Sequence, residues 1–296
     1  MTIATSEIGM DAGAIRRRRL GRERLFYRLC AAPALLLTFL VGIAPLALML
    51  VQSVRDQKTE AWTLDYYIAS FTNPFFTRTL ATTIAMAAGV SIVAILIGLP
   101  MAYLLARKVL LRNLLMPVIT VPRMLPFVVI GYAMILLLAP VTGVLNKTLL
   151  STGIISEPLF ILFDWPGQAL AFGYTAIVVA IGILTGVLMS VDPQLEDAAV
   201  SLGASRIRSF FTVTLPLSVP GIIAAGALIF TSVTTAYSIP VMLAGRTPFM
   251  VSIVVATNLL TLQQPHLAYA QAVVVSVLAI GATAFAHFIL SRYGRR

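Results

Sequence analysis

The sequence is poor in charged residues and in the side chains that build metal sites or disulfides. Only 11% of its 296 residues are charged, against about 25% in soluble domains, while 59% are hydrophobic. The one cysteine, Cys30, excludes a disulfide framework. His266 and His287 stand far apart with no Cys/His cluster around them, so no metal site is predicted. With a mean hydropathy of +0.96, much of the chain must have lipid as its solvent.

The chain also lacks the motifs of an enzyme that converts energy or hydrolyses substrates. It has no Gly-x-x-x-x-Gly-Lys-Ser/Thr loop for ATP and no Gly-x-Ser-x-Gly elbow or metalloprotease helix. The apolar runs are nearly free of ionisable side chains, and the main exception, Arg123, is placed close to the end of its run. A coupling proton is therefore disfavoured, whereas sodium coupling through backbone carbonyls stays open. The sequence predicts a conduit whose energy comes from a partner, with an ion-coupled carrier and a membrane-embedded enzyme as alternatives.

Six apolar runs are long enough to cross a bilayer as helices, which predicts an all-α, polytopic membrane protein. The third run contains Pro117, Pro122 and Pro126 beside Arg123, so it is expected to be broken and either lines the pathway or is simply irregular. Gly182 and Gly186 on one face of the fourth run predict close packing within the bundle. The predicted spans are Leu29–Val54, Leu80–Ala106, Leu114–Leu138, Ala169–Val191, Gly221–Ala244 and Leu267–Leu290.

The basic residues lie between the apolar runs and act as topology signals rather than as a patch for nucleic acid, despite a net charge of +10. Residues 1–28 form a basic N-terminal segment, and residues 29–296 form the predicted six-span domain. Most of the 21 lysines and arginines fall in segments that lie inside if the N-terminus is cytoplasmic. The positive-inside rule therefore predicts that both termini are cytoplasmic.

One segment between the fourth and fifth runs, residues 192–220, predicts a rigid helix–turn–helix at the membrane surface. Asp192 and Pro193 are a helix start, Gly203 permits a tight turn, and Ser205 can cap a second short helix that ends at Pro216. Such a shape suits insertion into a groove of another protein, whereas a surface-lying amphipathic connector is the plain alternative. We call this segment the 192–220 loop.

The 192–220 loop resembles the EAA loop of binding-protein-dependent ABC importer permeases. That pattern is Glu-Ala-Ala, three residues, Gly, nine residues, then Ile-x-Leu-Pro, and two positions depart from it: Asp197 replaces Glu, with Glu196 adjacent, and Val213 replaces Ile. The segments Gly153–Leu159, Pro220–Ile222 and Tyr237–Gly245 also look like the spermidine/putrescine branch of this family. The positions expected to couple to an ATPase are Glu196, Asp197, Ala198, Ala199, Gly203, Leu215 and Pro216.

The resemblance implies a bacterial inner-membrane subunit that is not itself an enzyme and holds no cofactor. In that family two permeases, here expected to be a heterodimer, form the pathway, two ATPase subunits bind and hydrolyse ATP, and a periplasmic solute-binding protein delivers the solute. The resemblance further implies that Glu196 or Asp197 pairs with a basic group of the ATPase, that Ala198 and Ala199 pack in its cleft, and that Gly203 forms the turn.

The solute is the least constrained part of this interpretation. The branch favours a polyamine, with iron, thiamine, phosphonate and organic acids or amino compounds as alternatives. The acidic loop residues Glu157 and Asp164 are read as solvated rather than as a cation funnel. The residues proposed to line the pathway are Arg123, Pro126, Tyr132, Tyr237 and Pro240, although packing or an interfacial position would also account for the two tyrosines.

Overall fold

The computed structural model describes residues 32–33, 36–243, 245 and 250–293, apart from the side chains of Leu111 and Tyr293. The basic N-terminal segment and Cys30 lie outside the described residues. Contacts divide the chain into two units, Met1–Trp62 and Thr63–Arg296, which we describe separately.

The described residues of the first unit include an apolar helical stretch. The π-helix η1 (Thr38–Ile43) continues into α2 (Ala44–Ser53), and together they are short for a membrane span. A turn follows, in which the carboxylate of Asp56 accepts backbone hydrogen bonds from Lys58 and Thr59. The start of the predicted first span, from Leu29 to Ala31, lies outside the described residues.

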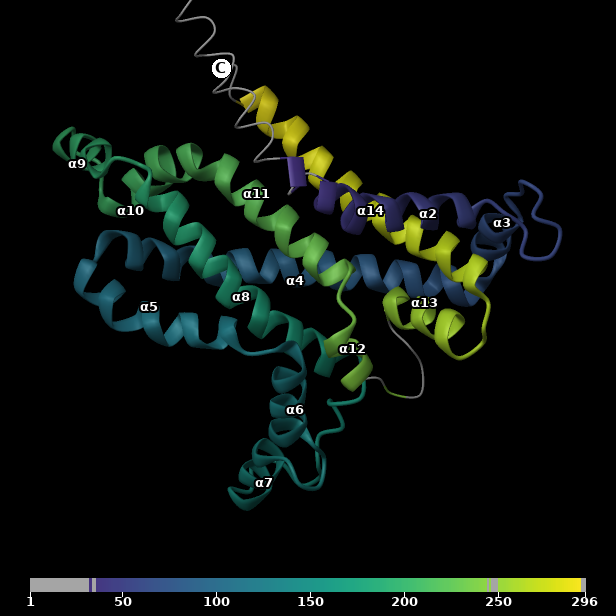
Figure 1. The fold of residues 1–296 in the computed structure, drawn as a ribbon. Coiled ribbons are helices and arrows are strands. Elements are labelled where there is room, and N and C mark those ends of the chain that lie inside the picture. Colours follow the sequence, from purple (N-terminus) through teal and green to yellow (C-terminus); the bar gives the residue numbers. More distant parts are fainter. Residues whose placement is uncertain (1–31, 34–35, 244, 246–249, 294–296) are drawn as a thin grey trace, which may run out of the picture. The chain divides into compact units, whose positions relative to one another are not determined.

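The second unit is built from helices in all of its described regular elements (Figure 1). Helix α8 packs along α4, α11 packs against both, and α14 lies on the other side of α11. The helices are α3 (Asp65–Thr72), α4 (Pro74–Arg107), α5 (Val109–Met124), α6 (Phe127–Leu138), α7 (Val144–Ser151), α8 (Trp165–Met189), α9 (Pro193–Ser201), α10 (Arg206–Ser209), η2 (Phe210–Thr214), α11 (Leu215–Thr234), α12 (Ser238–Met242), α13 (Val251–Leu260) and α14 (Pro265–Tyr293).

The all-α, polytopic architecture predicted from the sequence is confirmed, while the count of six spans stays a prediction. Among the described residues, four helical stretches are long and apolar enough to cross a membrane, and α5 with α6 gives a fifth if the pair is one broken span. The four stretches are Pro74–Arg107, Trp165–Met189, Arg206–Thr234 and Pro265–Arg292.

The predicted third span is not one crossing helix. Helices α5 and α6 meet at 101°, and only Pro126 marks the break, because Leu125 before it is extended with ψ of 135°. Proline disfavours the helical conformation of the residue that precedes it, so the helix ends there. Pro117 and Pro122 lie inside α5 without breaking it, contrary to the sequence prediction.

The predicted fifth span is displaced toward the 192–220 loop. The helical stretch begins at Arg206 rather than Gly221 and ends at Thr234, so Pro216 and Pro220 do not end the second loop helix. The π-helix η2 ends at Thr214, two residues before Pro216. The proline nitrogen has no hydrogen to donate, and a π-turn accommodates the missing hydrogen bond. Pro240 lies beyond a break at residues 235–237, in the separate helix α12.

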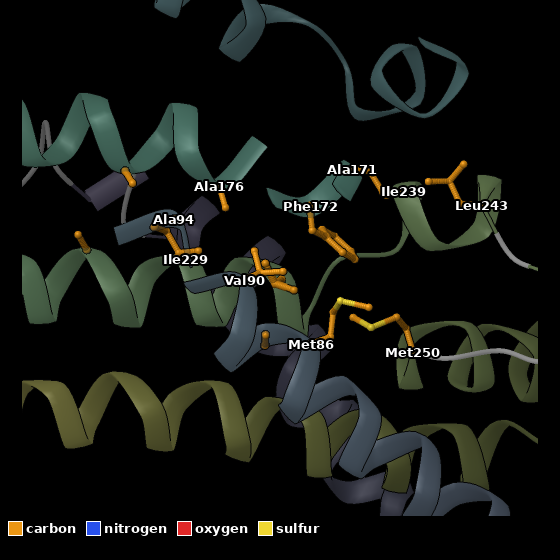
Figure 2. Close-up of a cluster of buried hydrophobic side chains, with 14 of the residues drawn as sticks. Met86, Val90, Ala94, Ala171, Phe172, Ala176, Ile229, Ile239, Leu243 and Met250 are labelled. Carbon is orange, nitrogen blue, oxygen red and sulfur yellow. The ribbon is translucent and has the colours of Figure 1, made fainter. Parts of the chain in front are cut away.

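The packed centre of the second unit joins α4, α8, α11 and α12 (Figure 2). Alanines buried on the helix faces, such as Ala94 and Ala180, allow close approach, and a Cβ added at Gly98 would lie 2.9 Å from Cβ of Ala180. Lipid provides no hydrophobic drive between helices, so small residues stabilise the bundle through van der Waals contact. The methionines Met86 and Met250 fill the space beside Phe172.

Candidate functional site

The 192–220 loop begins, turns and resumes a helix where the sequence predicts, although its second helix continues past Pro216. The Asp192 carboxylate accepts a hydrogen bond from the Gln194 backbone and caps α9, which opens with Pro193. Gly203 has a φ of +93°, in the region that favours glycine, and it turns the chain toward α10. The Ser205 hydroxyl then accepts a hydrogen bond from the Arg208 backbone and caps α10.

A buried polar cluster fastens the inner side of this loop. The side chain of Glu196, only 4% exposed, accepts hydrogen bonds from Tyr103 Oη at 2.9 Å, from Arg107 Nη2 at 2.6 Å and from the Thr214 hydroxyl. Because Tyr103 and Arg107 belong to α4 and Thr214 to η2, one carboxylate joins α9 to two other helices. We call Tyr103, Arg107, Glu196 and Thr214 the Glu196 cluster.

Arg107 also fixes the end of α8 to the same cluster. Its Nη1 donates to the carbonyl oxygens of Leu188 at 3.4 Å and Val191 at 3.2 Å, where the last turn of a helix leaves carbonyls without partners. The Ser209 hydroxyl donates to the backbone oxygen of Glu196 at 3.2 Å and holds α10 against α9. The ends of α4 and α8 therefore cannot move freely relative to the loop.

The cluster keeps the Glu196 carboxyl ionised. Burial raises its pKa, but the hydrogen bonds from Thr214, Arg107 and Tyr103, together with the charge of Arg107, outweigh burial, and the pKa lies below its ordinary value. A buried carboxylate of this kind is stable only while its partners remain in place.

The two acidic residues proposed to meet a partner are placed differently. Glu196 is directed inward, whereas Asp197 is exposed and pairs with Arg206 at 3.3 Å on the surface. The sequence left the two open as partners of a basic group, and of the two only Asp197 is accessible. Ala198 is exposed and Ala199 half-buried beside it; Leu215 is half-buried and Pro216 exposed at the start of α11.

Sequence reasoning missed Tyr103, Arg107 and Thr214. Arg107 was interpreted as a topology signal only, and it lies 89 positions from Glu196. No periodicity or motif connects residues at that separation. The sequence offered one signal for this contact: an arginine, Arg107, ends a long apolar run, and an acidic loop that contains Glu196 follows later in the chain.

The outer side of the 192–220 loop is apolar and exposed. Leu202 is 90% exposed and Ile207 73% exposed, and Leu195 is also exposed on α9. Leu202 directly precedes the turn at Gly203 and Ile207 follows it, and no heavy atom lies within 4 Å of a Cβ added at Gly203. The loop therefore presents a small apolar knob on a base that the Glu196 cluster holds.

A cavity of about 570 Å³ lies between α5, α8, α11 and α12. Among the described residues that line it, Arg123 is the single charged side chain, and Thr175, Ser232, Thr235, Tyr237 and Ser238 contribute hydroxyl groups. A volume of this size accommodates a small solute.

The residues proposed to line a pathway are only partly gathered here. Arg123 and Tyr237 line the cavity, while Pro126 forms the break beside its lining residue Phe127. Tyr132 is 59% exposed on α6, and Pro240 is buried within α12. No sequence signal pointed to the hydroxyl groups of Ser232 and Thr235, because they come from a helix end that the sequence prediction placed mid-span.

The sequence has relatives among transport permeases. It is 27% identical to the spermidine/putrescine permease PotB of Haemophilus influenzae over 76% of this chain and 79% of PotB. It is 28% identical to the sulfate permease CysT of Salmonella typhimurium over 91% of this chain and 94% of CysT. The molybdenum permease ModB of Haemophilus influenzae is 36% identical over 50% of this chain and 65% of ModB.

The fold also matches solved structures. It aligns with a chain of a bacterial ABC transporter involved in the import of the acidic polysaccharide alginate, with a TM-score of 0.76 at 21% identity, covering 93% of this chain and 98% of that chain. The sequence model of the family described as binding-protein-dependent transport system inner membrane component matches residues 94–295. The chain therefore belongs to this family, the inner-membrane permease subunits of ABC importers.

Proposed function

We propose that this permease couples solute translocation to ATP hydrolysis on a separate subunit, through docking of the 192–220 loop. The observation that carries the proposal is the two-sided construction of the loop. Its exposed side offers Leu202 and Ile207 to a partner, and its buried side is held to α4 by Glu196 and Arg107. A displacement of the docked loop therefore reaches the membrane helices through a rigid polar contact rather than a loose connection.

The partner assembly follows from the same reasoning. The family is a permease rather than a catalytic subunit, so ATP is expected to bind to an ATPase whose cleft receives Ala198, Ala199 and the turn at Gly203. Asp197, being exposed, is the carboxylate that we expect to meet a basic group there, in competition with Arg206. Leu215 and Pro216 carry the docked loop directly into α11.

We further propose a second permease subunit, forming a heterodimer, and a periplasmic solute-binding protein as partners. The structure of a bacterial alginate ABC transporter in complex with an alginate-bound periplasmic protein has the same fold, with a TM-score of 0.79, which supports this arrangement. With the 192–220 loop facing the ATPase, both termini lie in the cytoplasm, in agreement with the distribution of lysine and arginine.

We propose that the transported solute is a small molecule. The relatives are named for solutes of opposite charge. The resemblance to PotB supports the polyamine expected from the sequence, whereas CysT and ModB are named for sulfate and molybdenum. The charge of the residues that line the cavity bears directly on this choice.

The docking proposal is tested by placing a charge on the exposed knob. Leu202→Asp should release the ATPase and abolish solute-stimulated ATP hydrolysis, because a carboxylate cannot be buried in an apolar cleft without a partner. Co-purification of the ATPase with the affinity-tagged permease, expressed with its partners, is the measurement.

Ile154→Asp is the matched control, because Ile154 is 71% exposed in the segment after α7 and far in sequence from the 192–220 loop. It should retain the ATPase at the wild-type level. Docking through the loop is wrong if Leu202→Asp retains both the ATPase and its stimulation.

A further inference from the structure

The described residues that line the cavity between α5, α8, α11 and α12 carry positive but no negative charge. In the part of the chain that the structure describes, the cavity lining includes Arg123 but no aspartate or glutamate. The remaining polar side chains carry hydroxyls, and those of Thr175, Ser232 and Thr235 donate to carbonyls of their own helices. The described lining therefore offers no carboxylate that would neutralise a positively charged solute.

Arg123 has no carboxylate partner among the described residues. The two ion pairs found there involve Arg107 and Arg206, and Arg123 takes part in neither. Its guanidinium instead lies against Gly182 of α8, where an added Cβ would be 2.5 Å from Nη1. Gly182 thus provides the room in which the charged group sits.

Arg123 is in the last turn of α5, at the opposite end of that helix from Val109, and it meets α8 at Gly182. Helices α5 and α8 contact near one end, where Arg112 Nη1 donates to Met189 Sδ at 3.3 Å. Gly182 precedes Met189 by about 10 Å along α8, at roughly 1.5 Å per residue. An arginine beside the apolar length of a membrane helix is energetically costly, and such residues mark solute pathways.

An anionic solute group would remove much of that cost. Guanidinium binds carboxylate, phosphate and sulfate-like oxygens through two parallel hydrogen bonds, and this geometry is specific to arginine. A polyamine would instead bring further positive charge to an arginine that no carboxylate neutralises.

We propose that Arg123 is a solute-binding residue and that the cavity receives an anionic group of the transported solute, a small oxyanion or a carboxylate. This rests on the proposed function, since it assigns the cavity to the translocation pathway. It favours an anion over the polyamine that the sequence resemblance suggests.

The charge selectivity of the cavity can be measured without knowing the solute. In a chain with Cys30→Ala, a reporter thiol is introduced by Ser232→Cys, which lines the cavity, or by Thr261→Cys, an exposed position that does not. The purified, detergent-solubilised chain is treated with an anionic sulfonatoethyl or a cationic trimethylammonioethyl methanethiosulfonate. The quantity compared is the ratio of the anionic to the cationic reaction rate, which cancels differences in thiol reactivity.

The ratio at Ser232→Cys should exceed the ratio at Thr261→Cys. A unit charge in a water-filled cavity changes the local concentration of monovalent ions a few-fold, in opposite directions for the two signs. Adding Arg123→Gln should therefore lower the ratio at Ser232→Cys about five- to tenfold. Arg112→Gln is the matched control, because it removes a charge from the same helix outside the cavity lining and should leave the ratio unchanged.

A second measurement addresses binding itself. Sodium molybdate and spermidine, at matched ionic strength, serve as anionic and cationic probes of the thermal stability of the full chain in nanodiscs. Molybdate should raise the unfolding temperature of the wild type and of Arg112→Gln but not of Arg123→Gln, and spermidine should have no such effect.

The proposal is overturned if the thiol ratio at Ser232→Cys does not exceed that at Thr261→Cys, if Arg123→Gln leaves it unchanged, or if spermidine stabilises the chain and molybdate does not. Both measurements use the permease alone. Failure of the Leu202→Asp test would therefore leave them standing, and their failure would not affect the docking of an ATPase.

Discussion

Arg107 Nη2 lies 2.6 Å from Glu196 Oε1, and the same guanidinium contacts the last carbonyls of α8. The pair connects the end of one membrane helix, the end of another and the first helix of the 192–220 loop. Glu196 is buried and Arg107 half-buried, with exposed fractions of 4% and 15%, so solvent weakens the pair little. The contact makes the loop part of the helical bundle rather than an appendage of it.

Arg107→Gln is expected to loosen the loop. Removing one partner of a buried ion pair typically costs about 3–5 kcal/mol, because the remaining charge stays buried without compensation. Amide hydrogen exchange in α9 and α10 should accelerate, with little change in α13 and α14. Lys108→Gln is the control, since Lys108 is exposed at the adjacent position and should exchange as the wild type does. Equal exchange in both variants would show that the pair does not hold the loop.

The loop is expected to loosen in acid. The folded-state pKa of Glu196 lies below its value in the unfolded chain, so the stability that it contributes is complete above the unfolded pKa of about 4.3 and is lost as the pH falls through the folded pKa. Protection of α9 should therefore be constant near neutral pH and decline below about pH 4.

Glu196→Gln provides the reference for this pH dependence. Its α9 amides should be less protected at pH 7, and the acid-dependent decline assigned to Glu196 should be absent. The measurement is hydrogen exchange corrected for the intrinsic dependence of exchange on pH. A decline of the same size in both chains would assign the acid sensitivity to another group.

Gly203→Ala should destabilise the turn by about 1–2 kcal/mol, since an L-residue with a side chain is strained at positive φ. No heavy atom lies within 4 Å of the added Cβ, so the cost comes from backbone conformation rather than from a clash. Gly203→Asn should cost less, because asparagine tolerates this region. The protection of α9 and α10 reports the effect, and the idea fails if alanine and asparagine are equally tolerated.

Gly182→Ala tests the contact between α8 and Arg123. Alanine in a helix is favoured over glycine by up to about 1 kcal/mol, so Gly186→Ala, which meets nothing within 4 Å, should stabilise the chain. Gly182→Ala should gain less stability, because the added Cβ displaces the guanidinium of Arg123. Combining Gly182→Ala with Arg123→Gln should restore the gain, as measured from unfolding free energies in a double-mutant cycle. Additive free energies would place Arg123 away from Gly182.

Local signals in the sequence were sufficient for the first helix of the 192–220 loop, its turn and the start of its second helix. Asp192, Gly203 and Ser205 act on backbone groups two or three residues away, so their effects are the same in almost any surrounding. The apolar runs likewise indicated an all-helical membrane protein, because lipid requires backbone groups to be paired and a helix pairs them within its own segment.

The sequence was less reliable where neighbouring signals compete. Three prolines stand near Arg123, yet only Pro126 ends a helix, and Pro216 is accommodated by the π-helix η2. Whether a proline breaks a helix depends on whether surrounding groups can satisfy the carbonyl that it leaves unpaired, and those groups come from elsewhere in the chain.

Tertiary structure alone decided the surroundings of the charged residues. From sequence, Glu196 and Asp197 are equivalent neighbours, and Arg107 and Arg123 are two basic residues near apolar runs. Packing directs Glu196 onto Arg107, 89 positions away, leaves Asp197 on the surface, and sets Arg123 over Gly182 in a cavity without carboxylates among its described lining residues. Charges act through space, and the distances between them exist only once the helices have packed.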